Sequence, residues 1–477
     1  MVEAEAGPSA RPGPTGLQRP LALLVAGAFF MEILDGTVIA PAAPHIADDL
    51  GVSAVDVNVA ITGYLLTLAV LIPISGWLAD RFGARRVFTA ALVIFTLASA
   101  GCAMAPSLPV LTATRVLQGV GGAMMVPVGR LAVLRTTPKR DLVRAIAFLT
   151  WPALVAPVIA PALGGVLANY ASWRWIFIVN VPLGIAALVL ALRIVPDVRG
   201  PRRALDWRGF LLTAGGAAAL VVGLESVGAG RWGSAVTGLV LAAVLLTAAV
   251  RYLLRARRPL LDLRMLRVAT YRLTAAGGSV YRMVITAIPF LLPLLFQLGF
   301  GWSAAQAGLV VIALFVGNVG IKPATTPLMR RFGIRTLVLF SIAASAACLV
   351  GMALLTDETP LPVVLALLLA SGIVRSTGFT AYNSVAYADV EPDRMTGANT
   401  LMSTLQELGA GLGVAVGALF VRLGDPIGQV TGLSDAPATP YRVAFVLLVL
   451  VLLVPAVEAL RLSRTAGDVV TGHVSPH

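Results

Sequence analysis

The chain has 477 residues, of which 58% are apolar and only 12% charged, and its mean hydropathy is +0.89. A soluble domain carries about 25% charged residues, so this composition excludes an ordinary soluble enzyme and indicates a protein embedded in lipid. The net charge of +13 does not indicate nucleic-acid binding, because the arginines form short clusters between apolar runs. Cys102 and Cys348 lie inside apolar runs, where we expect reduced, buried thiols, and the histidines show no metal-binding spacing.

The apolar residues form runs of about 20 residues, the length that crosses about 30 Å of hydrocarbon as a helix. We predict fourteen transmembrane helices, preceded by a disordered segment at 1–19. The first run contains two acidic residues and no convincing cleavage site, so we interpret it as a retained helix and not as a signal peptide. The predicted spans are 20–42, 55–75, 87–105, 109–130, 143–168, 173–194, 208–227, 233–253, 272–298, 304–326, 336–356, 361–386, 397–420 and 441–461.

Basic residues predict the orientation of these helices. If the N-terminus is cytoplasmic, the cytoplasmic segments hold 28 of the 36 Lys and Arg residues and the outer segments hold four. This bias matches the positive-inside rule. We therefore expect a multi-pass protein of the inner (plasma) membrane with both termini in the cytoplasm.

An internal repeat divides the chain. The segment GWLADRFGARRVF (76–88) follows the second predicted helix, and TPLMRRFGIRTLV (326–338) follows the tenth. A shared RFGxR core at matching loops predicts two pseudo-symmetric six-helix bundles with two helices inserted between them. The predicted domains are a disordered N-terminus (1–19), an N-terminal bundle (20–200), an inserted helix pair with basic linkers (201–270), a C-terminal bundle (271–462) and a cytoplasmic tail (463–477).

Four motifs resemble those of the major facilitator superfamily, and in particular its fourteen-helix drug:proton antiporter branch. They are GWLADRFGARR after the second helix, LDGTVIAPAAP in the first, LTATRVLQGVGGA in the fourth and APVIAPALGG in the fifth. The fifth-helix pattern departs from the family at Ala156 and Ala160, where glycines are usual. The segments GGAMMVPVGRL and YASWRWIFIVNVPLG resemble the MdtD/HsrA-like subgroup. The resemblance covers about residues 20–460 and implies an all-α integral membrane protein with the major facilitator fold.

The resemblance also implies roles for the motif residues. In the family, the loop motif latches the two halves through its aspartate, and the bent fifth helix prevents proton leak. The alternatives are a loop that only sets orientation and an ordinary kinked helix. Carried onto this sequence, the latch comprises Gly76, Asp80, Arg81, Gly83, Arg85 and Arg86, with Arg130 as a candidate partner, and the fifth-helix pattern comprises Pro157, Pro161, Gly164 and Gly165.

Charged residues inside apolar runs are functional candidates, because a charge in hydrocarbon is costly unless it is paired or hydrated. Asp35 and Arg115 both lie about 21 Å from the inner ends of their predicted helices, counted at 1.5 Å per residue. They can pair, either as a protonation-gated ion pair or as a permanent salt bridge.

Further candidates lie in other helices. Glu32 is one turn from Asp35 and is either a proton carrier, a partner for a cationic drug or a structural partner of an arginine. Glu407 is expected to form a network with Arg282 and Arg375, for coupling or as a scaffold. Less specific candidates are Tyr382 and Asn383 as cavity groups, and Glu225 and Lys322 as interface or snorkelling residues near helix ends.

These patterns favour proton-coupled efflux of amphipathic, lipophilic small molecules. Export of an endogenous metabolite or lipid is the alternative, and a membrane sensor or scaffold is a third, disfavoured by the lack of an output domain. No Walker loop, GxSxG or HExxH motif is present, so no enzyme activity and no ATP drive are expected. We expect no cofactor beyond the proton gradient, contact with the lipid bilayer, no nucleic-acid partner and a monomer.

Overall fold

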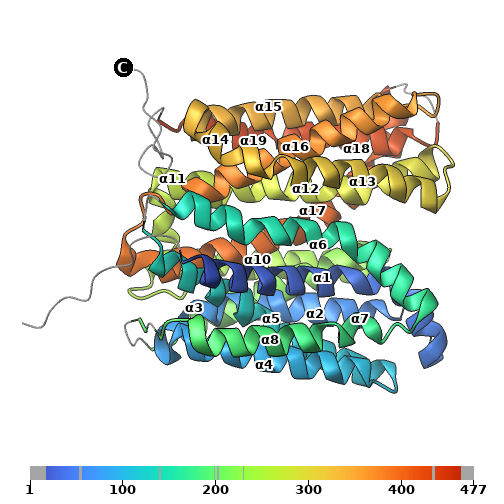
Figure 1. Cartoon of the computed structure of the whole chain (residues 1–477). Helices are drawn as coiled ribbons and strands as arrows, with labels where there is room; N and C mark the ends of the chain where they lie inside the picture. The colour runs from blue at the N-terminus through green and yellow to red at the C-terminus, as the bar shows by residue number, and fades with distance from the viewer. Residues whose placement is uncertain are drawn as a thin grey trace, which may run out of the picture.

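The computed structural model describes residues 18–52, 56–138, 141–197, 199–200, 204–228, 230–431 and 436–463, and all regular structure in these ranges is helical (Figure 1). The first bundle contains α1 (Arg19–Leu50), α2 (Asn58–Leu71), η1 (Ile72–Ile74), α3 (Ser75–Phe82), α4 (Ala84–Ala103), α5 (Leu108–Thr136), α6 (Leu142–Tyr170), α7 (Trp175–Ile178) and α8 (Asn180–Ile194). The inserted pair is α9 (Trp207–Gly228) and α10 (Trp232–Arg255). The second bundle follows with η3 (Leu263–Arg267), α11 (Ala269–Arg272), η4 (Leu273–Gly278), α12 (Ser279–Leu294), η5 (Leu295–Gly299), α13 (Ala304–Gly320), α14 (Lys322–Phe332), α15 (Ile334–Ala353), α16 (Leu361–Val385), η6 (Pro392–Arg394), α17 (Met395–Thr431), α18 (Thr439–Val451) and α19 (Leu453–Leu460).

Twelve helices of the described part are long and apolar enough to cross a membrane, or thirteen if the bent pair α13–α14 counts as one span. The fifth predicted span lies in α6, and the side chains of several α6 residues are outside the described set. The prediction of an all-helical membrane protein is therefore confirmed.

The helices form two bundles that lie one above the other in Figure 1. In the first, α1 packs on α6, and α5 packs on α2 and α4; in the second, α13 packs on α16, and α17 packs on α12 and α18. We call the end of the assembly where α1 begins and α19 ends the terminal side, and the opposite end the far side. In Figure 1 the terminal side is on the left.

Small residues let the helices of the second bundle approach closely, as is common inside membranes. A methyl group added at Gly372 of α16 would collide with the backbone of α13 at Leu314, and one at Gly317 would collide with the backbone at Leu369. This contact fixes α13 and α16 against each other without any charged residue.

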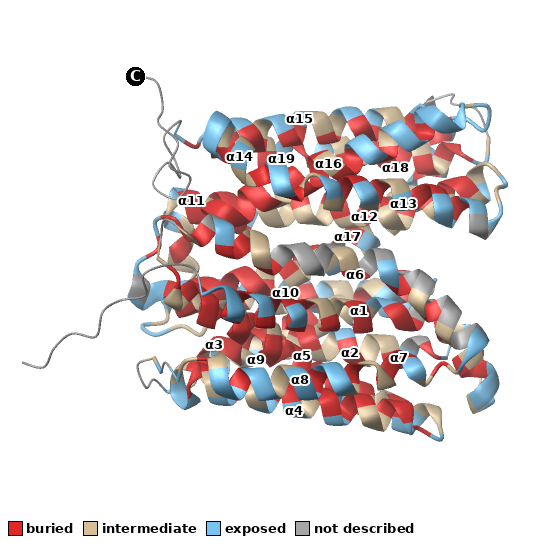
Figure 2. Ribbon diagram, viewed as in Figure 1, coloured by how far each residue is buried: buried red, intermediate tan, exposed pale blue. Residues whose placement is uncertain are grey.

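The inserted pair packs at the junction of the two bundles. Helix α9 contacts α10, α2 of the first bundle and α17 of the second. Helix α10 is the most peripheral, with only 17% of its apolar window buried, against 72% for α5. Figure 2 shows where buried and exposed residues lie on each helix.

Several predicted helix ends fall short of the observed ones, and two of them place charged residues differently. Helix α1 continues past 42 to Leu50, and its far end is held by hydrogen bonds from Arg174 and Trp173 to the Asp49 carboxylate at 2.6 and 3.1 Å. These two bonds hold the pKa of Asp49 below its ordinary value. The tenth span does not end at 326: it bends by 52° after Gly320 and continues as α14 to Phe332. Lys322 is consequently well inside the span and not near its end.

Candidate transport site

Asp35 of α1 and Arg115 of α5 form an ion pair inside the first bundle. Arg115 Nη1 lies 2.5 Å from Asp35 Oδ2, and both side chains are completely buried. The pairing that equal depth predicts is therefore confirmed, whereas a role in coupling stays a prediction.

Three further polar groups complete the surroundings of Asp35. Its Oδ1 accepts hydrogen bonds from Gln118 Nε2 at 2.9 Å and from Asn180 Nδ2 at 2.8 Å. Gln118 also accepts from Arg115 Nη1 at 2.7 Å and donates to Ser99 at 2.7 Å. The carboxylate thus has three donors from two helices besides its own, an arrangement that stabilises its charged form and that protonation would disrupt.

Sequence reasoning missed several of these partners. Asn180 stands alone among apolar residues in the run WIFIVNVPLG, which was the available signal. Tyr64 carried no signal of its own, yet its ring packs 4.1 Å from the Arg115 guanidinium carbon.

A second group of charges lies between the two bundles. The charges of Glu407, Arg130 and Arg282 all act on the Glu32 carboxylate, which is one turn from Asp35 on α1. Arg130 Nη1 donates to Gln406 Oε1 at 3.1 Å, and Gln406 donates to Asn383 at 2.6 Å. This central cluster draws residues from α1, α5, α12, α16 and α17, so it connects both halves of the molecule.

Arg375, predicted to form a network with Glu407, and Tyr382, predicted as a cavity group, lie outside this cluster. Arg375 donates to the backbone carbonyl of Ile285 at 3.2 Å and packs over Phe315 at 5.6 Å, so the predicted contact between Arg375 and Glu407 is wrong. The Tyr382 ring lies 5.4 Å from that of Tyr281, and its hydroxyl has no hydrogen-bond partner among the described residues. Arg375 and Glu407 lie at a similar depth, which predicted the contact. The Arg375 side chain, however, leaves α16 in another direction, towards Ile285 and Phe315.

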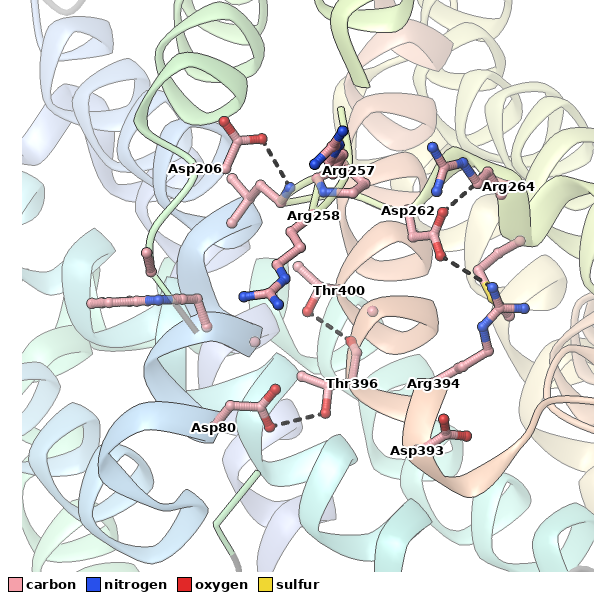
Figure 3. Close-up of a pocket in the computed structure, with 17 residues that line it drawn as sticks. Asp80, Asp206, Arg257, Arg258, Asp262, Arg264, Asp393, Arg394, Thr396 and Thr400 are labelled. Carbon is pink, nitrogen blue, oxygen red and sulfur yellow. Dashed lines mark hydrogen bonds and ion pairs between the residues drawn. The ribbon is translucent and has the colours of Figure 1, made fainter. Parts of the chain in front are cut away.

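The aspartate of the loop motif joins the halves at the terminal side. Asp80 Oδ1 accepts from Thr396 Oγ1 of the second bundle at 3.1 Å (Figure 3). It also accepts from Arg135 Nη2 of its own bundle at 2.6 Å, and Arg135 contacts Thr396 as well. The candidate partner Arg130 is therefore wrong, because Arg135, more than a turn further along α5, reaches Asp80 instead.

The other motif residues support this contact less directly. Gly83 has φ +95°, and a side chain there would meet Asp197 and Arg199 of the segment after α8. Arg81 packs over Trp77 at 5.9 Å. Within the described part of the chain, the Arg85 and Arg86 side chains have no ion-pair partner, so Asp80 is the charged residue of the motif that contacts the other half.

The hydrogen bonds between α1–α8 and α11–α19 that the structure describes all lie in the terminal half of the assembly. Besides the contacts of Asp80, Arg135 and Arg130, Asn399 Nδ2 donates to the Pro127 carbonyl at 2.9 Å. Their position indicates a state in which the two halves are closed on the terminal side.

Gly76 offers a test of this closed contact. A methyl group at Gly76 would overlap Thr400 and press on Thr396, both on the opposite half, whereas one at Gly397 would meet nothing within 4 Å. We expect Gly76→Ala to destabilise the closed state by about 1–3 kcal/mol, as overpacking does. Spin-label distances across the terminal side should lengthen in Gly76→Ala and not in the control Gly397→Ala. Unchanged distances in Gly76→Ala would contradict the described contact.

The fifth-helix pattern is only partly described. Helix α6 is helical from Leu142 to Tyr170, and Gly164 is buried within it. The side chains of Pro157 and Pro161, and the surroundings of Gly165, lie outside the described residues. The sealing role of this pattern stays a prediction.

Comparison with known proteins identifies the family. Residues 25–414 match the model of the Major Facilitator Superfamily, and residues 274–470 give a further match. The chain belongs to the major facilitator superfamily. It is 41% identical over 407 residues to Escherichia coli proteins provisionally named multidrug resistance protein MdtD, covering 84% of this chain and 85% of each relative. A protein of the same name from Escherichia fergusonii is 40% identical over the same length.

Two solved structures share the major facilitator fold. The human organic anion transporter MFSD10 has a TM-score of 0.67 at 15% identity, over 92% of this chain and 99% of its own. The proton:xylose symporter XylE has a TM-score of 0.61 at 13% identity, over 95% and 97%. These two likenesses show the fold. The family match and the MdtD relatives show that the chain is a multi-pass membrane transporter, and they confirm the MdtD-like subgroup that its motifs resemble.

Proposed function

We propose that this protein exports amphipathic small molecules in exchange for protons, by alternating access of a central site to the two sides of the inner membrane. In this proposal the chain crosses the membrane fourteen times, acts as a monomer and needs no cofactor besides the proton gradient. The terminal side faces the cytoplasm, as the bias of Lys and Arg towards its loops favours.

The observation that carries the proposal is the buried carboxylate of Asp35 with its arginine, glutamine and asparagine partners. A fully buried ion pair contributes little net stability and is retained in many proteins for a switch or a specific geometry. Proton binding to Asp35 would neutralise one partner and free Arg115, which changes the relative stability of the two access states. Glu32, one turn away, provides a path for the proton towards the central cluster.

The central cluster is suited to bind the polar or charged part of a substrate. It offers the carboxylates of Glu32 and Glu407 beside the guanidinium groups of Arg130 and Arg282. The name of the MdtD relatives favours drugs as substrates. Export of an endogenous metabolite or lipid is the alternative, and the two arginines would suit an anionic substrate.

Transport in inverted membrane vesicles tests the proposal. Respiration acidifies the lumen, a pH-sensitive dye reports the gradient, and a panel of lipophilic cations is then added. We expect partial collapse of the gradient with transported compounds, and none in vesicles from cells that carry an empty vector. If no cation collapses the gradient, the protein does not exchange lipophilic cations for protons. The same assay with lipophilic anions then decides whether a substrate of the opposite charge is exchanged.

A further inference from the structure

Lys322 is a buried lysine that has no acidic neighbour among the residues that the structure describes. Its side chain is 7% exposed, and its Nζ donates one hydrogen bond, at 2.6 Å, to Thr380 Oγ1 of α16. That hydroxyl in turn donates to the Ser376 carbonyl at 2.8 Å, so it acts as an acceptor for the amine. An ammonium group has three donors, and the structure gives this one a single acceptor.

Its position makes the burial more unusual. Lys322 begins α14 directly after the 52° bend of the tenth span, about 15 Å by helix rise from the terminal end at Phe332. The side chain therefore lies well short of the terminal end of the helix, and protein atoms surround its ammonium group.

The helices around Lys322 contain no acidic residue at all. Helix α14 packs against α6, α13, α15 and α16, and none of these five helices contains Asp or Glu. Their ionisable residues are Arg144 and Tyr170 on α6, Arg330 and Arg331 on α14, Arg335 and Cys348 on α15, and Arg375 and Tyr382 on α16. Every permanent charge on these helices is positive, so none of them favours a charged lysine.

The presence of lysine and not arginine at position 322 also favours a neutral side chain. Only two of the 36 Lys and Arg residues are lysines, Lys139 and Lys322. Arginine stays charged in proteins, whereas a lysine in an apolar environment releases its proton readily. At this buried position the chain thus has lysine, which can become neutral, and not arginine, which cannot.

We propose that Lys322 is uncharged in the state closed on the terminal side, and that it takes a proton from water when that side opens. Helix α14 contacts α6 of the first bundle, so separation of the halves at the terminal side would admit water to its neighbourhood. The proton is released when the site closes and dehydrates. Lys322 is then a second titrating group of the transport cycle, in the opposite half from Asp35, and it makes opening to the cytoplasm favoured by acid.

The inference rests on the proposed alternating access, but its test uses neither substrate nor proton gradient. Lys139→Arg leaves Lys322 as the only lysine, so one ¹³Cε-lysine signal reports its protonation in the full-length protein in nanodiscs. We expect the signal of the neutral amine at pH 8 and a change to the charged form on acidification. A charged signal at pH 8 and above would overturn the proposal.

The link to opening is measured separately. Spin labels replace Phe82 and Phe332, which are 47% and 46% exposed at the terminal ends of α3 and α14, after Cys102 and Cys348 are changed to Ser. With Lys322 intact, the ratio of open to closed states should rise by up to about tenfold per pH unit of acidification, the slope for one proton. The slope should fall in Lys322→Met, where only the contribution of the carboxylates remains, and Lys322→Arg should favour the open state at every pH. An unchanged slope in both variants would show that another group is the sensor.

The experiments distinguish an error in the Lys322 proposal from an error in the proposed function. Loss of drug:proton exchange would leave the lysine signal and the distance measurements unaffected. A charged, unresponsive Lys322 would leave the carboxylates of Asp35 and Glu32 as the proposed titrating groups and the exchange assay intact.

Discussion

Replacing Asp35 with Asn is expected to abolish substrate-dependent collapse of the proton gradient in inverted vesicles. The side-chain oxygen of asparagine can still accept the hydrogen bonds from Gln118 and Asn180, but the amide cannot bind and release a proton. Glu32→Gln tests the neighbouring carboxylate in the same assay, and the comparison of the two shows which residue is the principal carrier. Collapse at the wild-type rate in Asp35→Asn would remove Asp35 from the coupling mechanism.

A loss of folding must be separated from a loss of coupling. Removing one partner of a buried ion pair leaves the other charge uncompensated and costs about 3–5 kcal/mol. We therefore expect Asp35→Asn to unfold at a lower temperature, and the double variant Asp35→Asn/Arg115→Gln to recover most of that loss. The double variant should still show no exchange. Restored exchange in the double variant would mean that the pair is only structural.

Replacing Asp80 with Asn is expected to open the terminal side. The carboxylate accepts a hydrogen bond from Thr396 of the second bundle and pairs with Arg135 of its own bundle, which also contacts Thr396. The Arg135 and Asp80 side chains are only 13% and 17% exposed. Loss of a hydrogen bond to a charged group costs about 1.5–3 kcal/mol, which corresponds to a rise of about 10- to 100-fold in the ratio of open to closed states. Distances between spin labels at positions 82 and 332 measure this ratio. The rate of exchange should fall as the ratio rises.

The same pocket provides the matched control. Asp393 lines the 520 Å³ pocket with Asp80, and its carboxylate has no partner among the described residues (Figure 3). Asp393→Asn should leave the distances unchanged, and Arg135→Gln should reproduce Asp80→Asn. If Asp393→Asn opened the terminal side as far as Asp80→Asn, the effect would come from pocket charge in general and not from the latch.

The sequence alone predicted the positions of the helices and the depth of their charges. Runs of apolar residues located the spans because lipid requires continuous helices, and the 1.5 Å rise placed Asp35 and Arg115 at one level. Depth does not give the direction in which a side chain points. For this reason Arg375 was assigned to the central cluster, although α16 turns it towards Phe315, and Arg130 was assigned to Asp80, although Arg135 makes that contact.

Bends and partners without charge were also beyond sequence reasoning. The break after Gly320 extends the tenth span and moves Lys322 from its predicted end into its interior. Polar residues such as Thr396, Asn399 and Gln406 have no distinctive spacing, because they act through a helix far away in the chain. Only the packing of α17 against α3 and α5 brings them to their partners.

The placement of α9 makes the two edges of the molecule unequal towards the lipid. Helix α9 lies along both α2 and α17, so it screens the edge where those helices meet, while α6 meets α13, α14 and α16 along the opposite edge. A compound dissolved in the bilayer would therefore meet α9 before it reaches α2 and α17 at the first edge. The inserted pair would thereby shield one junction of the two halves from the lipid, whatever the proton gradient.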